Sequence, residues 1–127
     1  MLKKYIIFDF AGTIVKMRPA KLLVKKELLL KISTKYNLGI ITGAKKTETM
    51  NILSKLGINK LFSTIITSED SILKKPNPKL FPILPIIAYV GDTKKDFYFA
   101  KNAGITFFRV NKCCNINQIL ERMYEEK

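Results

Sequence analysis

Four polar side chains stand where their types and spacing could carry out chemistry. Asp9, Thr42 and Asp92 each follow an apolar, strand-like run, and Lys75 lies in a polar loop broken by prolines. Because parallel strands end at one edge of a sheet, we expect these side chains to meet there. Two carboxylates held close together, with a backbone carbonyl and waters, suit Mg²⁺, while a lysine and a hydroxyl complement a bound phosphate. The pattern therefore predicts phosphoryl transfer.

Each of these side chains also has an ordinary interpretation. Taken alone, Asp9 could be a solvated residue before a glycine turn. Thr42 could cap the helix that follows it, and Asp96 could be an acidic residue in a helix's first turn. Lys75 could be a solvated loop lysine, and its neighbour Lys74 could take the role assigned to it. Their joint placement at strand ends favours the functional interpretation.

Short apolar runs alternating with helix-forming stretches predict the elements that position these residues. Because such alternation is typical of βα units, we expect a doubly wound α/β fold with a five-stranded parallel sheet and helices on both faces. The predicted strands are residues 3–10, 38–42, 63–67, 86–90 and 106–110, and the predicted helices about 20–36, 44–56, 94–103 and 116–126.

Length and composition bound the remaining possibilities. With 127 residues, the chain is expected to form one domain, 1–127. It contains no histidine, so Ser-His-Asp, Cys-His and histidine-zinc sites are excluded, and the adjacent Cys113 and Cys114 fit no ordinary metal spacing. No apolar run is long enough for a membrane span and no signal peptide is indicated, which favours a cytoplasmic protein without a membrane partner.

The net charge of +13 raises the question of a nucleic-acid partner. The basic residues are mostly lysines, 20 against 3 arginines, and they are scattered through every segment. Because arginine clusters and stacking platforms are missing from the sequence, nucleic-acid binding is not favoured.

Four short motifs, in order along the chain, resemble those of the haloacid dehalogenase (HAD) superfamily. They are Asp9-Phe10-Ala11-Gly12-Thr13, then Thr42 after Ile40-Ile41, then Lys75 in Lys-Pro-Asn-Pro, and Gly91-Asp92-Thr93-Lys94-Lys95-Asp96. The resemblance covers nearly the whole chain. It implies a HAD-like core with strand order 5-4-1-2-3 and an Mg²⁺-dependent hydrolase, most simply a phosphatase acting on a small or macromolecular phosphorylated substrate.

The resemblance also implies a role for each residue of the motifs. Asp9 would be the nucleophile that forms an aspartyl-phosphate, and Thr42 and Lys75 would complete the catalytic set. Mg²⁺ would be held by Asp9, Asp92 and the backbone carbonyl of Ala11, with Asp96 in a supporting role. The expected substrate-binding residues are Gly12, Thr13, Gly43 and Ala44.

Two departures from the family pattern qualify these expectations. Ala11 stands where most phosphatases of this family carry a second aspartate, the general acid, and its loss typically lowers the rate about 10²- to 10⁴-fold. The spacings of 33 positions from Asp9 to Thr42 and from Thr42 to Lys75 leave no room for the usual cap insertions. The link of 17 positions from Lys75 to Asp92 holds four prolines, so we expect a single helical turn near residues 79–81, with oligomerisation covering the exposed face.

Three functions remain open at this point. The first is a capless, Mg²⁺-dependent phosphatase with activity weakened by Ala11. The second is an inactive HAD-like module that binds phosphate and Mg²⁺ or a partner. A nucleic-acid-associated phosphatase is a distant third.

Overall fold

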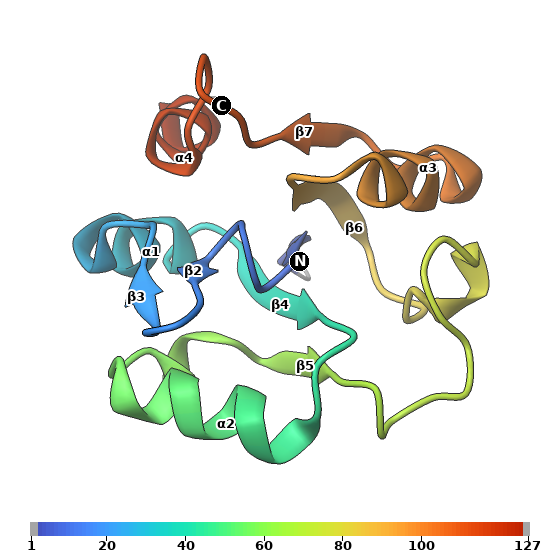
Figure 1. Cartoon of the computed structure of the whole chain (residues 1–127). Coiled ribbons are helices and arrows are strands. Elements are labelled where there is room, and N and C mark those ends of the chain that lie inside the picture. The colour runs from blue at the N-terminus through green and yellow to red at the C-terminus, as the bar shows by residue number, and fades with distance from the viewer. Residues whose placement is uncertain (1–2, 126–127) are drawn as a thin grey trace.

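The computed structural model describes residues 3–125, and a five-stranded parallel sheet lies at its centre (Figure 1). The strands are β1 (Tyr5–Phe8), β4 (Asn37–Ile41), β5 (Thr64–Ile66), β6 (Ile86–Gly91) and β7 (Phe107–Arg109), in the order β5-β4-β1-β6-β7. Counted along the chain and read from the β7 edge, this order is 5-4-1-2-3, as expected. β1 is central and pairs with β4 and β6, so the residue after it reaches the middle of the sheet's carboxyl edge.

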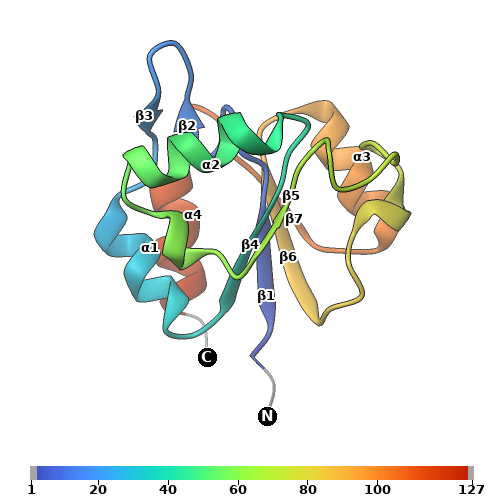
Figure 2. The same cartoon turned by 90° about the horizontal axis from the view of Figure 1, so that it is seen from below.

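Helices cover both faces of the sheet, as Figure 2 shows. The helices α1 (Lys26–Ser33), α2 (Lys46–Lys55) and α4 (Ile116–Glu125) pack on one face, where Ile6, Phe8 and Val90 join the larger core. The other face is covered by α3 (Lys94–Ala103) and the short 3₁₀ turn η2 (Pro78–Leu80). Side chains buried on both faces explain why β1 is a continuous apolar run without alternation.

The segment after β1 differs from the prediction of a long helix over 20–36. Here β2 (Val15–Lys16) and β3 (Lys21–Leu22) form a hairpin, and α1 begins only at Lys26. The helix-forming residues before it are held by other contacts: the amide of Leu23 donates to Ile14 and that of Lys25 to the Asn117 side chain. These tertiary pairings override the intrinsic helix preference of the segment.

The proline-rich link on the α3 face contains only η2, close to the expected single turn. Phe81, at its end, stacks on Phe99 of α3 with ring centroids 3.8 Å apart and meets Tyr89 edge-on at 5.4 Å. Aromatic contacts thus cover a part of the sheet that a crossover helix would otherwise cover. A further 3₁₀ turn, η1 (Asn59–Leu61), precedes β5.

The leucines in and before α1 are divided between the core and the surface. Leu28 and Leu29 of α1 are buried, whereas Leu23 and Leu30 are exposed at 38% and 47%. Between residues 3 and 125, no helix combines the length and apolar character needed to cross a membrane. Oligomerisation remains a prediction.

Candidate active site

Asp9 follows β1 directly and opens a tight turn. Its amide donates to Val90 O at 2.8 Å, which fixes it against β6, and the next residues wrap around the carbonyl of Phe10. Gly12 has φ +85°, and a Cβ at this position would collide with the Asp92 carboxylate. Glycine is therefore required both by the left-handed backbone and by the close approach of this turn to the end of β6.

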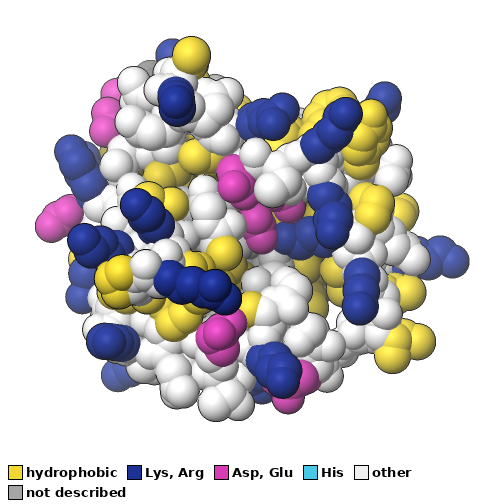
Figure 3. Space-filling model, viewed as in Figure 1, with side chains coloured by type: hydrophobic (Ala, Val, Ile, Leu, Met, Phe, Trp, Pro, Cys, Tyr) yellow, Lys and Arg dark blue, Asp and Glu magenta, His cyan; other side chains and the backbone are white. Residues whose placement is uncertain are grey.

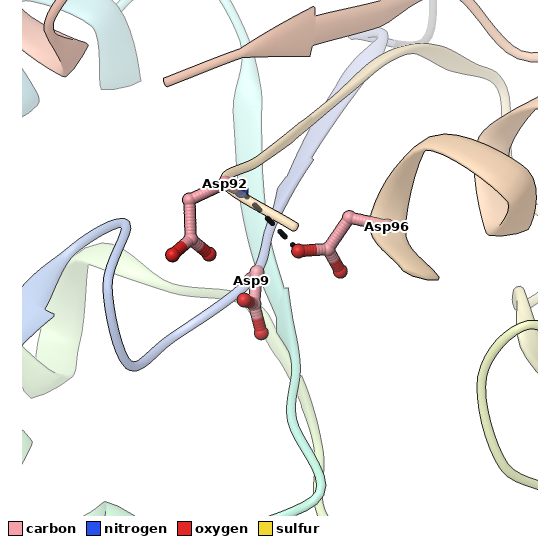
Figure 4. A group of neighbouring side chains, drawn as sticks. All are labelled: Asp9, Asp92 and Asp96. Atoms are coloured by element: carbon pink, nitrogen blue, oxygen red, sulfur yellow. Dashed lines mark hydrogen bonds between the residues drawn. The ribbon is translucent and has the colours of Figure 1, made fainter. Parts of the chain in front are cut away.

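Three carboxylates converge at this edge of the sheet, as Figure 4 shows. Asp9, Asp92 and Asp96 each offer a carboxylate oxygen, and these oxygens lie within 4.8 Å of one another. Asp92 follows β6, and Asp96 lies in the first turn of α3. In the space-filling view, acidic side chains gather near the middle of this face with basic side chains around them (Figure 3).

Asp96 is the most fully hydrogen-bonded of the three. Its Oδ2 accepts from the amides of Asp92 and Thr93 and from the Thr93 hydroxyl, at 3.3, 3.2 and 2.9 Å. Its Oδ1 accepts from the Tyr89 hydroxyl at 2.7 Å and from Lys75 Nζ at 3.2 Å. With Thr93 at the N-cap, Asp96 completes a capping box on α3. Its oxygens are thus committed to protein donors.

Lys75 is the cation of the cluster. Its Nζ lies 2.8 Å from Asp9 Oδ1 and so bridges Asp9 and Asp96, while the rings of Tyr89 and Phe99 lie 5.4 and 5.9 Å from it. The side chain is 11% exposed. Lys75, and not Lys74, therefore makes the contact with Asp9.

Electrostatics distinguish the two carboxylates that share Lys75. Burial raises the pKa of the Asp9 carboxyl to about 7, with Asp96 adding to the effect and Lys75 and the Phe10 amide opposing it. Burial also works against ionisation of Asp96, but Lys75, Tyr89 and Thr93 outweigh it and hold the pKa of Asp96 below its usual range. Asp96 is the more firmly ionised partner because more donors reach it.

Thr42 directly follows β4, the strand that pairs with β1 on the side opposite β6. Its side chain is buried, and its Oγ1 accepts from the Ala44 amide at 3.2 Å. The predicted helix start at Ala44 is wrong by two residues, because α2 begins at Lys46 and the turn is closed locally by this hydrogen bond. The Ala44 amide is thereby occupied, while the Thr42 hydroxyl keeps its own proton to donate.

A pocket of about 400 Å³ lies beside these residues. Asp9, Thr42, Gly43, Lys75 and Asp96 all line it, so it joins five of the residues predicted from the sequence. Its other lining residues come from the end of β4, from β5 and the loop after it, from η2 and from the start of α3: Ile41, Ile66, Thr67, Ser68, Ser71, Leu73, Lys74, Leu80, Thr93 and Lys95.

The remaining predicted residues lie around the pocket and not in its lining. Thr13 is fully buried and its hydroxyl donates to Asp92 Oδ1 at 3.3 Å. Ala11 is exposed and forms an isolated bridge with Val15, while the Gly12 amide donates to Val15 O. Ala44 and Asp92 are also outside the lining. Thr13 thus contacts Asp92, and the structure places it away from the pocket surface.

Tyr89 is the site residue that sequence reasoning missed. It looks like one more apolar residue of β6, yet its hydroxyl donates to Asp96 from a fully buried side chain. Burial, together with Asp9 and Asp96, raises the pKa of Tyr89, so the phenol stays a donor. The available signal was the single hydroxyl in an otherwise apolar strand, because a buried hydroxyl requires a partner.

The fold and the acidic cluster define an α/β protein with a pocket and three carboxylates at the carboxyl edge of a parallel sheet. The family model for haloacid dehalogenase-like hydrolases matches residues 24–110. The chain belongs to this family.

Curated relatives include a glyceraldehyde 3-phosphate phosphatase of Methanopyrus kandleri, 33% identical over 86 residues, and a phosphoglycolate phosphatase of Yersinia pestis, 33% identical over 75. The matches cover 61% and 53% of this chain but only 37% and 32% of those proteins. The chain therefore spans about a third of the length of the curated relatives it matches.

Solved structures with a similar fold include a HAD phosphatase from Thermococcus onnurineus, with a TM-score of 0.76 and 18% identity over 94% of this chain and 96% of that one. Phosphatase Tt82 from Thermococcus thioreducens has a TM-score of 0.68 and 26% identity, covering 85% of this chain and 47% of that one. The core domain of a Streptococcus pneumoniae protein aligns over 100% of this chain and 98% of its own, with a TM-score of 0.70 and 24% identity. Similarity thus extends over the whole fold.

Proposed function

We propose that the protein is an Mg²⁺-dependent phosphohydrolase that acts through an aspartyl-phosphate on Asp9. The observation that carries this proposal is the position of the Asp9 carboxylate, which lies in a pocket with Lys75 2.8 Å away and Asp92 beside it. The two curated relatives, named for the dephosphorylation of small phosphorylated compounds, support the same reaction class.

The residues around Asp9 fit a hard divalent cation. Asp9, Asp92 and the carbonyl of Ala11 would hold Mg²⁺, whereas Asp96, already bonded to five protein donors, would orient the site. When bound, Mg²⁺ would neutralise charge on the phosphoryl oxygens. The hydrogen bond from the Thr13 hydroxyl restrains the Asp92 carboxylate, which has an oxygen within 4.8 Å of one from Asp9 and one from Asp96.

The proposed reaction has two steps. A carboxylate oxygen of Asp9 attacks phosphorus, the bond from phosphorus to the substrate oxygen breaks, and the leaving oxygen takes a proton from water. A second water then attacks the phosphorus of the aspartyl-phosphate and the bond from phosphorus to Asp9 breaks, which releases inorganic phosphate and restores the Asp9 carboxylate. The proton that this water loses neutralises the hydroxide left by the first. Lys75 and the Thr42 hydroxyl would bind the phosphoryl oxygens in both steps.

Ala11 limits which substrates can react. Its methyl group offers no proton to the leaving oxygen, so substrates whose leaving groups are already stable as anions, such as acyl and aryl phosphates, are favoured. The segment from β1 to β4 holds only the β2–β3 hairpin and α1, and the one from β5 to β6 only η2. Within residues 3–125 the pocket would therefore work without a cap.

Mass spectrometry tests the proposed nucleophile. Incubation with acetyl phosphate and Mg²⁺ is expected to add one phosphoryl group to the wild type and none to Asp9→Asn, with turnover of p-nitrophenyl phosphate lost in parallel. Asp70→Asn, which alters an aspartate outside the pocket, is the matched control and should behave as wild type. Absence of both the adduct and turnover in the wild type would refute the proposed phosphohydrolase activity.

The second candidate is a binding module that keeps the pocket without turnover, and the observation that favours it is the exposed Ala11 methyl at the position of the proton donor. Ala11→Asp separates the two candidates. If the rest of the pocket is competent, this variant should hydrolyse alkyl phosphates about 10²-fold faster than the wild type or better. If Ala11→Asp hydrolyses alkyl phosphates no faster, and the protein binds phosphate in an Mg²⁺-dependent manner, the binding module is supported.

A further inference from the structure

The pocket beside Asp9 is larger than a phosphoryl group requires. Its volume is about 400 Å³, near the lower end of the roughly 300–1,000 Å³ typical of pockets for small organic ligands. Part of its lining is an apolar wall, to which the ends of β4 and β5, the loop after β5 and η2 each contribute. That wall is formed by Ile41, Ile66, Leu73 and Leu80. There is thus room for a short organic body attached to the phosphate.

Two lysines line the same pocket outside the proposed catalytic set. Lys74 comes from the loop after β5 and Lys95 from the first turn of α3, so they approach the pocket from different elements. Lys75 is occupied by Asp9 and Asp96, but neither Lys74 nor Lys95 lies in an ion pair within residues 3–125. The pocket therefore has three lysines against two lining carboxylates, and the two outer lysines lack an acidic partner.

The apolar wall and the two outer lysines indicate the chemistry of the ligand. We propose that Lys74 and Lys95 form an anion subsite that binds a carboxylate at the end of the substrate opposite the phosphate, which makes the substrate a small phosphorylated carboxylic acid. This inference rests on the proposed phosphohydrolase function, in which Lys75 and Thr42 receive the phosphate. Of the compounds in the relatives' names, phosphoglycolate carries such a carboxylate, and glyceraldehyde 3-phosphate ends in an uncharged aldehyde.

The size of the effect follows from the exposure of both lysines. Ion pairs at exposed positions contribute modestly, so each lysine should favour the carboxylate about two- to fivefold, and the two together roughly tenfold. Because such contacts are screened by ions, the preference should shrink as salt is raised.

A matched pair of substrates tests the subsite. 2-Hydroxyethyl phosphate has a CH₂OH group where 2-phosphoglycolate has its carboxylate. Both are alkyl phosphates, so the missing proton donor at Ala11 slows them alike and the ratio of their kcat/KM values isolates the carboxylate. The wild type is expected to prefer 2-phosphoglycolate roughly tenfold, and the double variant Lys74→Ala/Lys95→Ala should bring the ratio near one. Lys79→Ala, which removes an exposed lysine of η2 that lines a different hollow, should keep the wild-type ratio. A ratio near one in the wild type, or unchanged in the double variant, would overturn the subsite.

A binding measurement keeps the test independent of turnover. Calorimetric titration of the Asp9→Asn protein with each compound in the presence of Mg²⁺ should show the same preference for 2-phosphoglycolate. The preference should be lost in the triple variant Asp9→Asn/Lys74→Ala/Lys95→Ala. If the preference appears in binding but the wild type releases no phosphate from either compound or from p-nitrophenyl phosphate, the phosphohydrolase function fails and the subsite stands. If phosphate is released without any preference, the subsite fails and the function stands.

Discussion

The two sides of the candidate active site are built differently. On the side of β6 and α3, Asp96 is held by five protein donors, and the rings of Tyr89 and Phe99 lie beside Lys75. On the side of β4 and β5, the lining is a turn and a loop that carry hydroxyls and the exposed Lys74. The first side uses its polar groups to fix the geometry, and the second leaves polar groups free to meet a ligand. Substitutions should therefore change stability on the first side and ligand preference on the second.

Lys75→Met should have the largest effect. Removal of this cation leaves Asp9 and Asp96 close together without their shared partner, and loss of one member of a buried ion pair typically destabilises by about 3–5 kcal/mol. Urea unfolding of the metal-free protein measures the change. Lys74→Met is the control, because it removes the neighbouring lysine without breaking an ion pair of the described residues. Equal unfolding free energies for the two variants would show that the ion pairs of Lys75 do not stabilise the fold.

The pH dependence of stability tests the raised pKa of Asp9. The native pKa of Asp9 is about 7 against an ordinary value of 3.8, so between these values the native state binds more protons than the unfolded chain. Stability of the metal-free protein should accordingly fall as the pH rises from about 4 to 7, by on the order of 3 kcal/mol, and Asp9→Asn should flatten the curve. Thermal unfolding across this range checks the sign. A wild-type stability that rises between pH 5 and 7 would show that Asp9 is ionised throughout.

Tyr89→Phe should have an intermediate effect. The variant keeps the ring under Lys75 but removes the hydroxyl that donates to Asp96, and a hydrogen bond to a charged group contributes about 2 kcal/mol. Chemical unfolding gives the loss, with Tyr98→Phe as the control on the exposed face of α3. If both variants were as stable as the wild type, Asp96 would not depend on this donor.

Lys46→Met, on the side of β4 and β5, should have the smallest effect on stability. Lys46 Nζ lies 2.7 Å from Asp70 and ties α2 to the loop after β5, but its side chain is 53% exposed. Exposed ion pairs contribute little to stability, so the melting temperature should change less than in the other variants. The measurement is calorimetric unfolding at low and high salt. A loss of stability as large as that of Tyr89→Phe would mean that the side of β4 and β5 is fixed as firmly as the side of β6 and α3.

The sequence was sufficient for the sheet because its strands are continuous apolar runs separated by helix formers and glycine stops. It was also sufficient to bring Asp9, Thr42 and Asp96 to one pocket, since they lie just after strands or in the helix turn that follows one. Lys75 lies in a loop, and only the motif that contains it pointed to the same pocket. The hairpin of β2 and β3 was missed because local helix preference there is overridden by pairing and by Asn117 of a distant helix. The role of Tyr89 was missed because a hydroxyl's partner is set by tertiary contact and not by periodicity.

Gly12 has a consequence for how this sequence can vary. Its backbone is left-handed, and the space that a side chain would fill already holds the Asp92 carboxylate. An alanine scan would record a loss at this position even though no side chain is removed. In a saturation library screened for function, codon 12 should therefore tolerate no replacement, whereas its exposed neighbour at codon 11 should accept many. The contrast between positions 11 and 12 would show that the backbone of this turn is constrained at a single residue.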